Sequence, residues 1–221
     1  MQNLISIIIP AYNGAEYIAE TIEGIKRQKM DVEIIVVDDC SADNTAEIAE
    51  DLGCHVIRHT KNTGQVIGKN TGIRAAKGSY VIFNDQDDIM RDGALQRLFQ
   101  ELGTDKVASA VMAKSQDFLS PDAQSVSSFV KTEAVWGMFT GATLFRKEVF
   151  DIIGLFDESV KLNTGETIIV MSKMKEHNLE MKKIDFISVD RRIHDNNFGI
   201  TNQKKEYQDY ASVLRAKLVS K

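Results

Sequence analysis

Residues 80–88 read Tyr-Val-Ile-Phe-Asn-Asp-Gln-Asp-Asp, in which an apolar run leads directly into a cluster of aspartates. A short run without polar alternation is typical of a strand buried on both faces of a parallel sheet. Carboxylates at the end of such a strand repel one another unless a cation or hydrogen-bond donors lie among them. The Asp-x-Asp pattern therefore predicts a site for Mg²⁺ or Mn²⁺. A solvated turn that begins a helix is the alternative interpretation.

The same pattern recurs on the N-terminal side of this stretch. Apolar runs predict strands at residues 5–9, 33–37 and 54–57, and apolar residues at helical spacing predict helices at 18–25, 48–52 and 64–76. Strands that alternate with helices are typical of a mostly parallel, doubly wound sheet, in which ligands bind beyond the carboxyl ends of the strands. Asp38 and Asp39 also follow a predicted strand, so the two acidic clusters are expected to converge on one crevice.

Local signals predict where the first helices begin and end. Asn13, followed three residues later by Glu16, resembles a capping box. Ser41 can cap the second helix, and Gly53 can end it.

The second half of the sequence is less regular. Its patterns predict helices at 95–103, 147–153 and 166–177, and strands at 107–112, 140–145 and 184–189. Residues 114–135 are polar and rich in serine, and they are expected to form a long loop. Residues 201–221 carry an apolar stripe that predicts an amphipathic helix. We expect one α/β domain over residues 1–221, with a mostly parallel, Rossmann-like central sheet flanked by helices and a smaller mixed C-terminal portion.

Composition narrows the class of protein. The 221 residues include 27 Lys and Arg and 32 Asp and Glu, a net charge of −5, which argues against a nucleic-acid partner. The two cysteines form no Cys-x-x-Cys pair, and the N-terminal apolar run is too short for a secretory signal. No stretch approaches the roughly 20 apolar residues that span a bilayer. We therefore expect a soluble, cytoplasmic protein, for which peripheral contact with a membrane stays open.

Two common phosphate-binding motifs are not matched. Between Gly64 and Gly68 lie three residues rather than the four of a P-loop, and Asn70 follows Lys69 where a P-loop has Ser or Thr. No Gly-x-Gly-x-x-Gly follows the first predicted strand, so a dinucleotide-dependent dehydrogenase is not supported. Phosphate would have to be held by a metal ion or by basic side chains.

A series of motifs resembles the family 2 glycosyltransferases, which have the GT-A fold. The motifs follow the order of the family over roughly residues 4–200, and they are residues 6–13 (SIIIPAYN), 37–45 (VDDCSADNT), 62–64 (NTG), 68–73 (GKNTGI), 78–88 (GSYVIFNDQDD), 154–158 (GLFDE) and 191–197 (RRIHDNN). The resemblance implies a GT-A-like fold in which residues 1–103 bind a nucleotide-sugar and residues 104–200 form the acceptor and catalytic half.

The resemblance also implies roles for residues of the donor site. Pro10, Ala11 and Tyr12 would form the wall of the nucleoside pocket, and Asp38 or Asp39 would accept the N–H of a uracil-type base, a choice that the sequence leaves open. The other residues implied to bind the nucleotide-sugar are Asn62, Lys69, Asp85, Gln86, Arg191 and Arg192.

The metal and catalytic residues implied by the resemblance are acids and one histidine. Asp87 would be the main ligand of Mn²⁺ or Mg²⁺, with Asp85 and His194 beside it. Inverting transfer also needs a carboxylate that takes the proton of the acceptor. Glu166 is the first candidate and Asp157 the second, whereas Thr167 and Ile169 stand where the family often has acids.

The predicted function is inverting transfer of a sugar, with a UDP-sugar favoured as donor, to a carbohydrate, lipid-linked or peptide acceptor. Such a reaction would serve the synthesis of cell-surface polysaccharide or another glycoconjugate. A degenerate GT-A module that binds a nucleotide or a partner without turnover is one alternative. A metal-dependent nucleotidyltransferase that uses the same carboxylates is the other.

Overall fold

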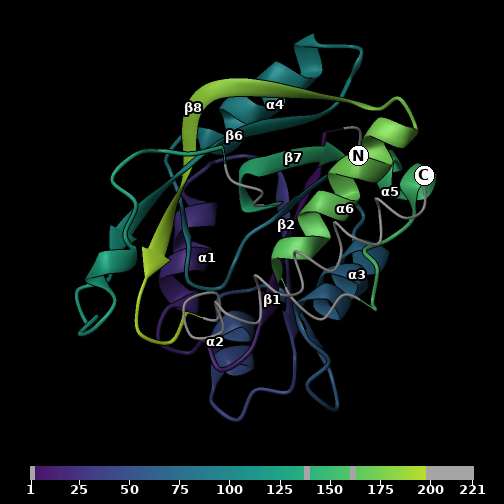
Figure 1. The fold of residues 1–221 in the computed structure, drawn as a ribbon. Coiled ribbons are helices and arrows are strands. Elements are labelled where there is room, and N and C mark those ends of the chain that lie inside the picture. The colour runs from purple at the N-terminus through teal and green to yellow at the C-terminus, as the bar shows by residue number, and fades with distance from the viewer. Residues whose placement is uncertain (1–2, 137–139, 160–162, 198–221) are drawn as a thin grey trace.

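The apolar runs of the sequence form the centre of one mixed sheet. The computed structural model describes residues 3–136, 140–159 and 163–197 (Figure 1). The helix predicted at 201–221 lies outside the described residues. The strands are β1 (Ile5–Ala11), β2 (Val32–Asp38), β3 (His55–Arg58), β4 (Tyr80–Phe83), β5 (Ile89–Met90), β6 (Ala108–Leu119), β7 (Thr143–Arg146) and β8 (Glu180–Ile193).

Helices cover both faces of this sheet (Figure 1). The α-helices are α1 (Ile18–Lys26), α2 (Thr45–Asp51), α3 (Gln65–Ala75), α4 (Ala94–Thr104), α5 (Glu148–Ile153) and α6 (Asn163–Glu176). Two short 3₁₀ turns, Ser127–Phe129 and Thr140–Ala142, lie in the second half.

The sheet order is β3-β2-β1-β4-β7-β6-β8-β5. Strands β3, β2, β1 and β4 are parallel, β7 is antiparallel to both β4 and β6, and β5 is antiparallel to β8. The predicted α/β class, with a parallel first half and a mixed second half, is confirmed. The carboxyl ends of β1, β2 and β4 meet at one edge of the sheet, because Ala11 pairs with Asp38 and Ile8 pairs with Phe83.

Alternation along the strands builds two hydrophobic layers. Ile7 and Ile9 of β1 pack in one layer with residues of α1, α2 and α4, whereas Ile8 packs in the other with residues of α3, α5 and α6. All three side chains are fully buried. A strand buried on both faces needs no polar alternation, which explains the continuous apolar run.

The predicted helix caps are wrong in two places. Helix α1 begins after Tyr17, while Asn13 has a left-handed backbone with φ of 49° and its side-chain oxygen accepts from the Ala42 N–H. Helix α2 begins after Asn44, and the Ser41 hydroxyl instead accepts from the Asn13 N–H at 2.9 Å. These polar side chains link two loops rather than ending helices.

The predicted loop at 114–135 is also corrected, because β6 continues to Leu119. The long β6 pairs in parallel with β8, which spans Glu180–Ile193 rather than residues 184–189. The strand predicted at 140–145 begins at Thr143, after the 3₁₀ turn. These longer strands carry the residues of the second half to the edge where β4 ends.

Candidate active site

The acidic turn that follows β4 meets the end of β8. Asp87 Oδ2 lies 2.8 Å from His194 Nε2, and it accepts from the Asn197 amide at 3.2 Å. Asp85 Oδ1 accepts from the Gln65 amide of α3 at 2.7 Å. The structure thus brings two of the three predicted metal ligands, Asp87 and His194, into contact, and it places Asp85 two residues away in the same turn.

The electrostatics of this turn suit a divalent cation. Burial raises the pKa of the Asp85 carboxyl to about 6; the charge of Lys69 opposes that rise, and the charges of Asp87 and Glu166 add to it. Burial also raises the pKa of Asp88 well above its usual range. A bound cation would offset the repulsion among these acids. Within the ranges that the structure describes, no three His, Cys, Asp or Glu side chains form a ready metal centre.

Arg192 anchors the end of β8 to the acidic turn. Its backbone N–H donates to Asp88 Oδ1 at 2.9 Å, and its Nε donates to the Asp87 carbonyl at 3.0 Å. The guanidinium is 4.9 Å from the ring centroids of both Tyr17 and Phe118, and the residue is 4% exposed. Arg192, which was predicted to bind the diphosphate, is thus buried and held by protein partners in this structure.

Arg191 is more accessible than Arg192. It is half-buried, and its Nη1 lies 3.6 Å from Asp117 Oδ1. Its charge acts favourably on the ionised forms of Asp85 and Asp88. Arg191 is therefore the arginine of the pair whose charge is available near the acidic turn.

Of the three residues predicted to form the nucleoside wall, Pro10 and Ala11 are buried and only Tyr12 is exposed. Pro10 and Ala11 are buried at the end of β1, and α3 packs so closely that a Cβ on Gly68 would lie 3.1 Å from the Pro10 Cβ. Tyr12 is 47% exposed and presents its ring at the edge. The Gln86 amide, predicted to bind the nucleotide-sugar, instead holds the Tyr12 backbone through two hydrogen bonds.

The two aspartates that follow β2 have different surroundings. Asp39 accepts hydrogen bonds from the Thr63 N–H and hydroxyl, the Gly64 N–H and His59 Nδ1. These hydrogen bonds outweigh the effect of burial, the largest single influence, so that the pKa of Asp39 is lowered. Asp38 accepts from the Ser41 N–H at 3.3 Å. Its other oxygen is buried without a hydrogen-bond partner in the described part of the chain.

No local motif predicts the partners of Asp39. His59 and Thr63 lie more than 19 residues away in the chain, and only the parallel pairing of β2 with β3 brings them together. The same is true of Gln65 and Asn197, whose contacts with the acidic turn depend on packing. Asn62, which was predicted to contact the donor, is exposed in the loop beside them.

The predicted base Glu166 lies in the first turn of α6 and forms a buried ion pair with Lys69 of α3. Their side chains are 2% and 3% exposed, and Lys69 Nζ lies 5.7 and 5.8 Å from the ring centroids of Phe83 and Phe156. Burial raises the pKa of Glu166, and the charge of Lys69 opposes that effect. The second carboxylate oxygen, Oε2, is buried without a hydrogen-bond partner among the described residues.

The second candidate base, Asp157, is exposed. Its Oδ1 accepts from the Ser159 hydroxyl at 2.6 Å and the Ser159 N–H at 3.0 Å. These hydrogen bonds lower its pKa, which makes it the weaker proton acceptor of the two.

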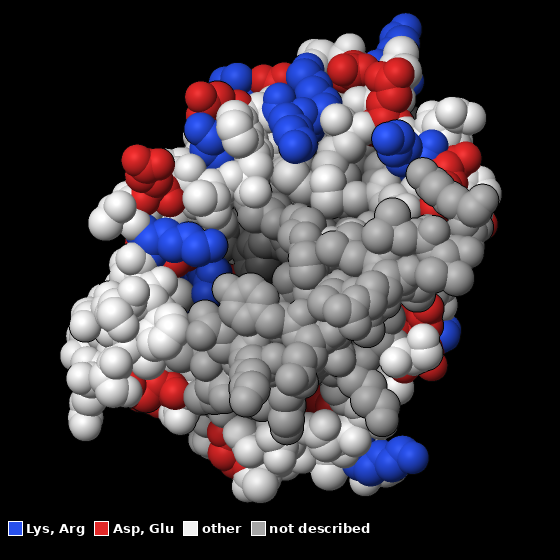
Figure 2. All heavy atoms as spheres, viewed as in Figure 1, with Lys and Arg blue, Asp and Glu red and all other residues white. Residues whose placement is uncertain are grey.

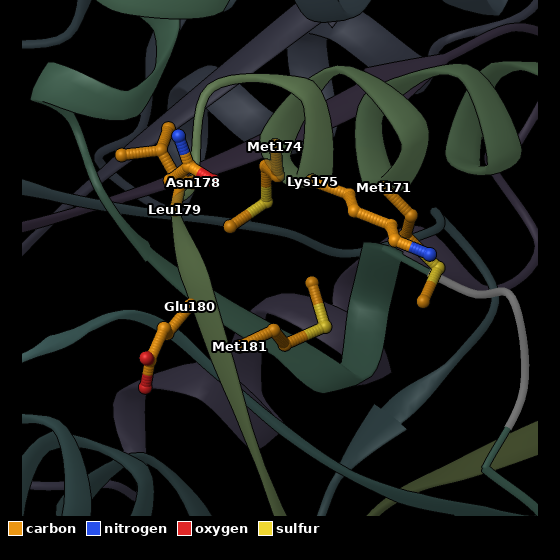
Figure 3. A pocket seen from close by; sticks show the side chains of 7 residues that line it. All are labelled: Met171, Met174, Lys175, Asn178, Leu179, Glu180 and Met181. Carbon is orange, nitrogen blue, oxygen red and sulfur yellow. The ribbon is translucent and has the colours of Figure 1, made fainter.

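A methionine-lined cavity of about 380 Å³ lies apart from these residues, at the end of α6 and the start of β8 (Figure 3). Met174 and Met181 line it from opposite sides, and Met174 is roughly 12 Å along the helix axis from Glu166. The cavity is therefore separate from the acidic turn.

On the face of the molecule shown in Figure 2, basic and acidic side chains are interspersed around the periphery. The described residues of this face thus form no large patch of one charge.

This sheet and its acidic turn define the GT-A transferase fold. S. aureus TarS in complex with UDP-GlcNAc matches with a TM-score of 0.69 at 21% identity, over 87% of this chain and 59% of that one. The mannosyltransferase PcManGT from Pyrobaculum calidifontis, in complex with GDP-Man and Mn²⁺, matches with a TM-score of 0.73 at 17% identity, over 96% of this chain and 64% of that one. A family model described as "Glycosyl transferase family 2" matches residues 6–156. The chain belongs to glycosyl transferase family 2.

One relative in sequence is the uncharacterized glycosyltransferase EpsJ of Bacillus subtilis. It is 33% identical over 182 residues, which cover 72% of this chain and 52% of EpsJ. The chain spans about half or less of the length of the first relatives that it matches. No helix among those that the structure describes is long and apolar enough to cross a membrane.

Proposed function

We propose that this chain binds a nucleotide-sugar with a divalent cation and transfers the sugar, with inversion, to an acceptor nucleophile. The observation that carries the proposal is the convergence of the acidic turn, His194 and the Lys69–Glu166 pair at the carboxyl ends of the strands. A UDP-sugar is the favoured donor, because TarS, a structure of the same fold, holds UDP-GlcNAc. PcManGT holds GDP-Man, so GDP belongs in every binding test.

The donor side of the proposed site consists of Asp85, Asp87 and His194. These residues would hold Mn²⁺ or Mg²⁺, which when bound supplies positive charge beside the leaving diphosphate. Arg191 would add charge at the same edge. The exposed ring of Tyr12 would contact the nucleoside.

Glu166 is the proposed base. Lys69 holds one of its oxygens, so the carboxylate is fixed in place. The second oxygen, Oε2, has no partner among the described residues and would accept the proton of the acceptor hydroxyl once acceptor binding opens a path to it. A raised pKa makes Glu166 a stronger proton acceptor than an ordinary carboxylate. The acceptor would be a carbohydrate, a lipid-linked sugar or a peptide, as in the synthesis of cell-surface polysaccharide.

Calorimetric titration with UDP and GDP, with Mn²⁺, Mg²⁺ or a chelator, tests the donor side. We expect metal-dependent binding that Asp87→Ala abolishes and that His194→Ala weakens by about 1–3 kcal/mol. Unchanged nucleotide affinity in the Asp87→Ala variant would refute the metal assignment.

Glu166→Gln tests the catalytic side. The amide keeps the size of the side chain but cannot accept the proton, so transfer should fall by roughly 10²–10⁴-fold while donor affinity is retained. Asp157→Asn is the matched control and should stay near wild type. Loss of donor binding in Glu166→Gln, or unaffected transfer, would rule out this role.

The second candidate function is donor binding without turnover. Thr167 and Ile169, which are 4% and 8% exposed, fill the first half of α6 where the family often has acids. Hydrolysis of a nucleotide-sugar distinguishes the alternatives: a glycosyltransferase releases UDP or GDP together with the free sugar, a nucleotidyltransferase that attacks the α-phosphorus releases a nucleoside monophosphate together with a sugar phosphate, and a binding module releases nothing.

A further inference from the structure

Gln86 joins two parts of the site that lie far apart in the sequence. Its Oε1 accepts from the Tyr12 N–H at 2.8 Å, and its Nε2 donates to the Tyr12 carbonyl at 3.2 Å. The Gln86 carbonyl accepts from the Thr21 hydroxyl at 2.9 Å. Because Gln86 stands between Asp85 and Asp87, the residue that fixes the Tyr12 backbone is part of the acidic turn.

The loop at residues 12–15 is shaped to receive this amide. A Cβ on Gly14 would lie 2.3 Å from Gln86 Oε1, closer than real contacts allow. The other side of the loop is fastened to residues 41–45, where the Gly14 N–H donates to Thr45 Oγ1 at 2.8 Å and the Ala15 N–H donates to Asp43 at 3.1 Å. The hydrogen bonds of Gln86 therefore hold the side of this loop that faces the acidic turn.

We propose that Gln86 is a positioning residue that couples the metal-binding turn to the nucleoside wall, so that a divalent cation and a nucleoside each raise the affinity for the other. This inference rests on the proposed function, which places the cation at Asp85 and Asp87 and the nucleoside against Tyr12. Repulsion between the two carboxylates loosens the turn, and a cation removes that repulsion. A fixed turn holds Gln86, and Gln86 holds the backbone that carries the exposed Tyr12 ring. Such coupling is reciprocal by linkage.

Uridine is the probe, because it carries no phosphate that could bind the cation directly. Calorimetry of the wild type should show uridine binding roughly 5- to 10-fold tighter with saturating Mn²⁺ than with a chelator, at the lower end of typical couplings. Guanosine replaces uridine if GDP is the nucleotide that binds. In the reciprocal titration, the nucleoside should raise the Mn²⁺ affinity by the same factor.

Two variants break the contact from opposite sides. Gln86→Met keeps the length of the side chain but removes both hydrogen bonds, and Gly14→Ala pushes the flexible amide away while leaving Gln86 itself intact. In both variants the effect of Mn²⁺ on uridine binding should fall to less than about 2-fold, whereas Mn²⁺-dependent UDP binding is weakened but retained. Gln96→Met, on an exposed face of α4, is the matched control and should keep the full coupling.

The outcomes separate this inference from the proposed function. If UDP binds only with Mn²⁺ but uridine is insensitive to Mn²⁺ in the wild type, the coupling is refuted and the function stands. Full coupling in both variants, with circular dichroism showing that each is folded, would refute the role of Gln86. If neither nucleotide binds with the cation present, the proposed function fails and the coupling fails with it.

Discussion

Replacing Lys69 with methionine should destabilise the protein by about 3–5 kcal/mol near pH 7.5, because the Glu166 carboxylate then stays buried without its opposite charge. The side chains of the pair are only 3% and 2% exposed, so water does not replace the lost partner. Methionine keeps apolar contact with the neighbouring rings of Phe83 and Phe156, whose centroids lie 5.7 and 5.8 Å from Lys69 Nζ in the wild type. The decrease in the free energy of unfolding therefore reports mainly the loss of the positive charge beside Glu166.

The pH dependence of this loss follows from the pKa of Glu166. Burial raises that pKa in the folded protein, and removal of Lys69 should raise it further. A carboxyl whose pKa is raised on folding contributes stability below its unfolded pKa, near 4.3, and that stability is lost as the pH rises through the folded pKa. The deficit of Lys69→Met relative to wild type should therefore shrink as the pH falls from about 7.5 towards the unfolded pKa near 4.3, because Glu166 takes up a proton in the folded variant.

Urea unfolding followed by far-UV circular dichroism measures both effects. The double variant Lys69→Met/Glu166→Leu should recover most of the lost stability, because no buried charge remains. Arg74→Met is the matched control: Arg74 pairs with Glu158 at 3.4 Å on the surface, with side chains 57% and 46% exposed, and its loss should cost less than about 1 kcal/mol. A Lys69→Met deficit below about 1 kcal/mol near pH 7.5, or one that does not change with pH, would refute the reasoning.

Three further predictions concern other parts of the fold. Gly72→Ala should cost about 1–3 kcal/mol in urea unfolding, because its Cβ would lie 2.3 Å from a side chain of β1, whereas Gly103→Ala meets no atom within 4 Å and should be neutral or slightly stabilising. Arg192→Lys should lower the unfolding free energy by about 2 kcal/mol or more, since a lysine cannot reproduce the planar fork that lies between two rings; a wild-type melting curve would contradict this. Alkylation near pH 8 should modify exposed Cys40 and spare Cys54, whose pKa burial raises to about 11, and mass spectrometry should show the second label only as the pH approaches that value.

The parallel half of the fold could be predicted because its signals are local. The apolar run of β1 and the strand before the acidic turn are buried on both faces, so their composition alone indicates their place. Gly53 ends α2 with a φ of 73°, as predicted from its position. Convergence of the Asp38-Asp39 pair with the acidic turn follows from the parallel order of the strands, which the helical connections imply.

The rest depends on contacts between distant segments. The end of β6 was mistaken for a loop because it is polar, yet its polar side chains are satisfied by a neighbouring segment. Gln116 donates to the Lys131 carbonyl at 3.1 Å, and Asp117 accepts from the Lys131 N–H at 3.1 Å. The hydrophobic pattern of a segment does not indicate which distant segment its polar groups bond. The hydrogen bonds of Gln86 and Arg192 could not be predicted for the same reason, since the partners of each lie more than 60 residues away in sequence.

The two parts of the proposed site depend on different kinds of contact: the donor side on residues at the ends of strands, and the base on the packing of helices. The proposed donor side is built from residues at the carboxyl ends of β1, β4 and β8, so the sheet itself fixes their positions. Glu166 comes from α6, and its place depends on α3, where Lys69 pairs with its carboxylate. The next residue of α3, Asn70, also bonds the backbone N–H and carbonyl of Phe156, in the segment that precedes α6. Changes where α3 contacts α6 and the segment before it should therefore alter transfer more than donor affinity, whereas changes in the strand-end turns should alter donor affinity first. A variant of Asn70 that lost nucleotide binding but kept the rate of transfer would contradict this arrangement.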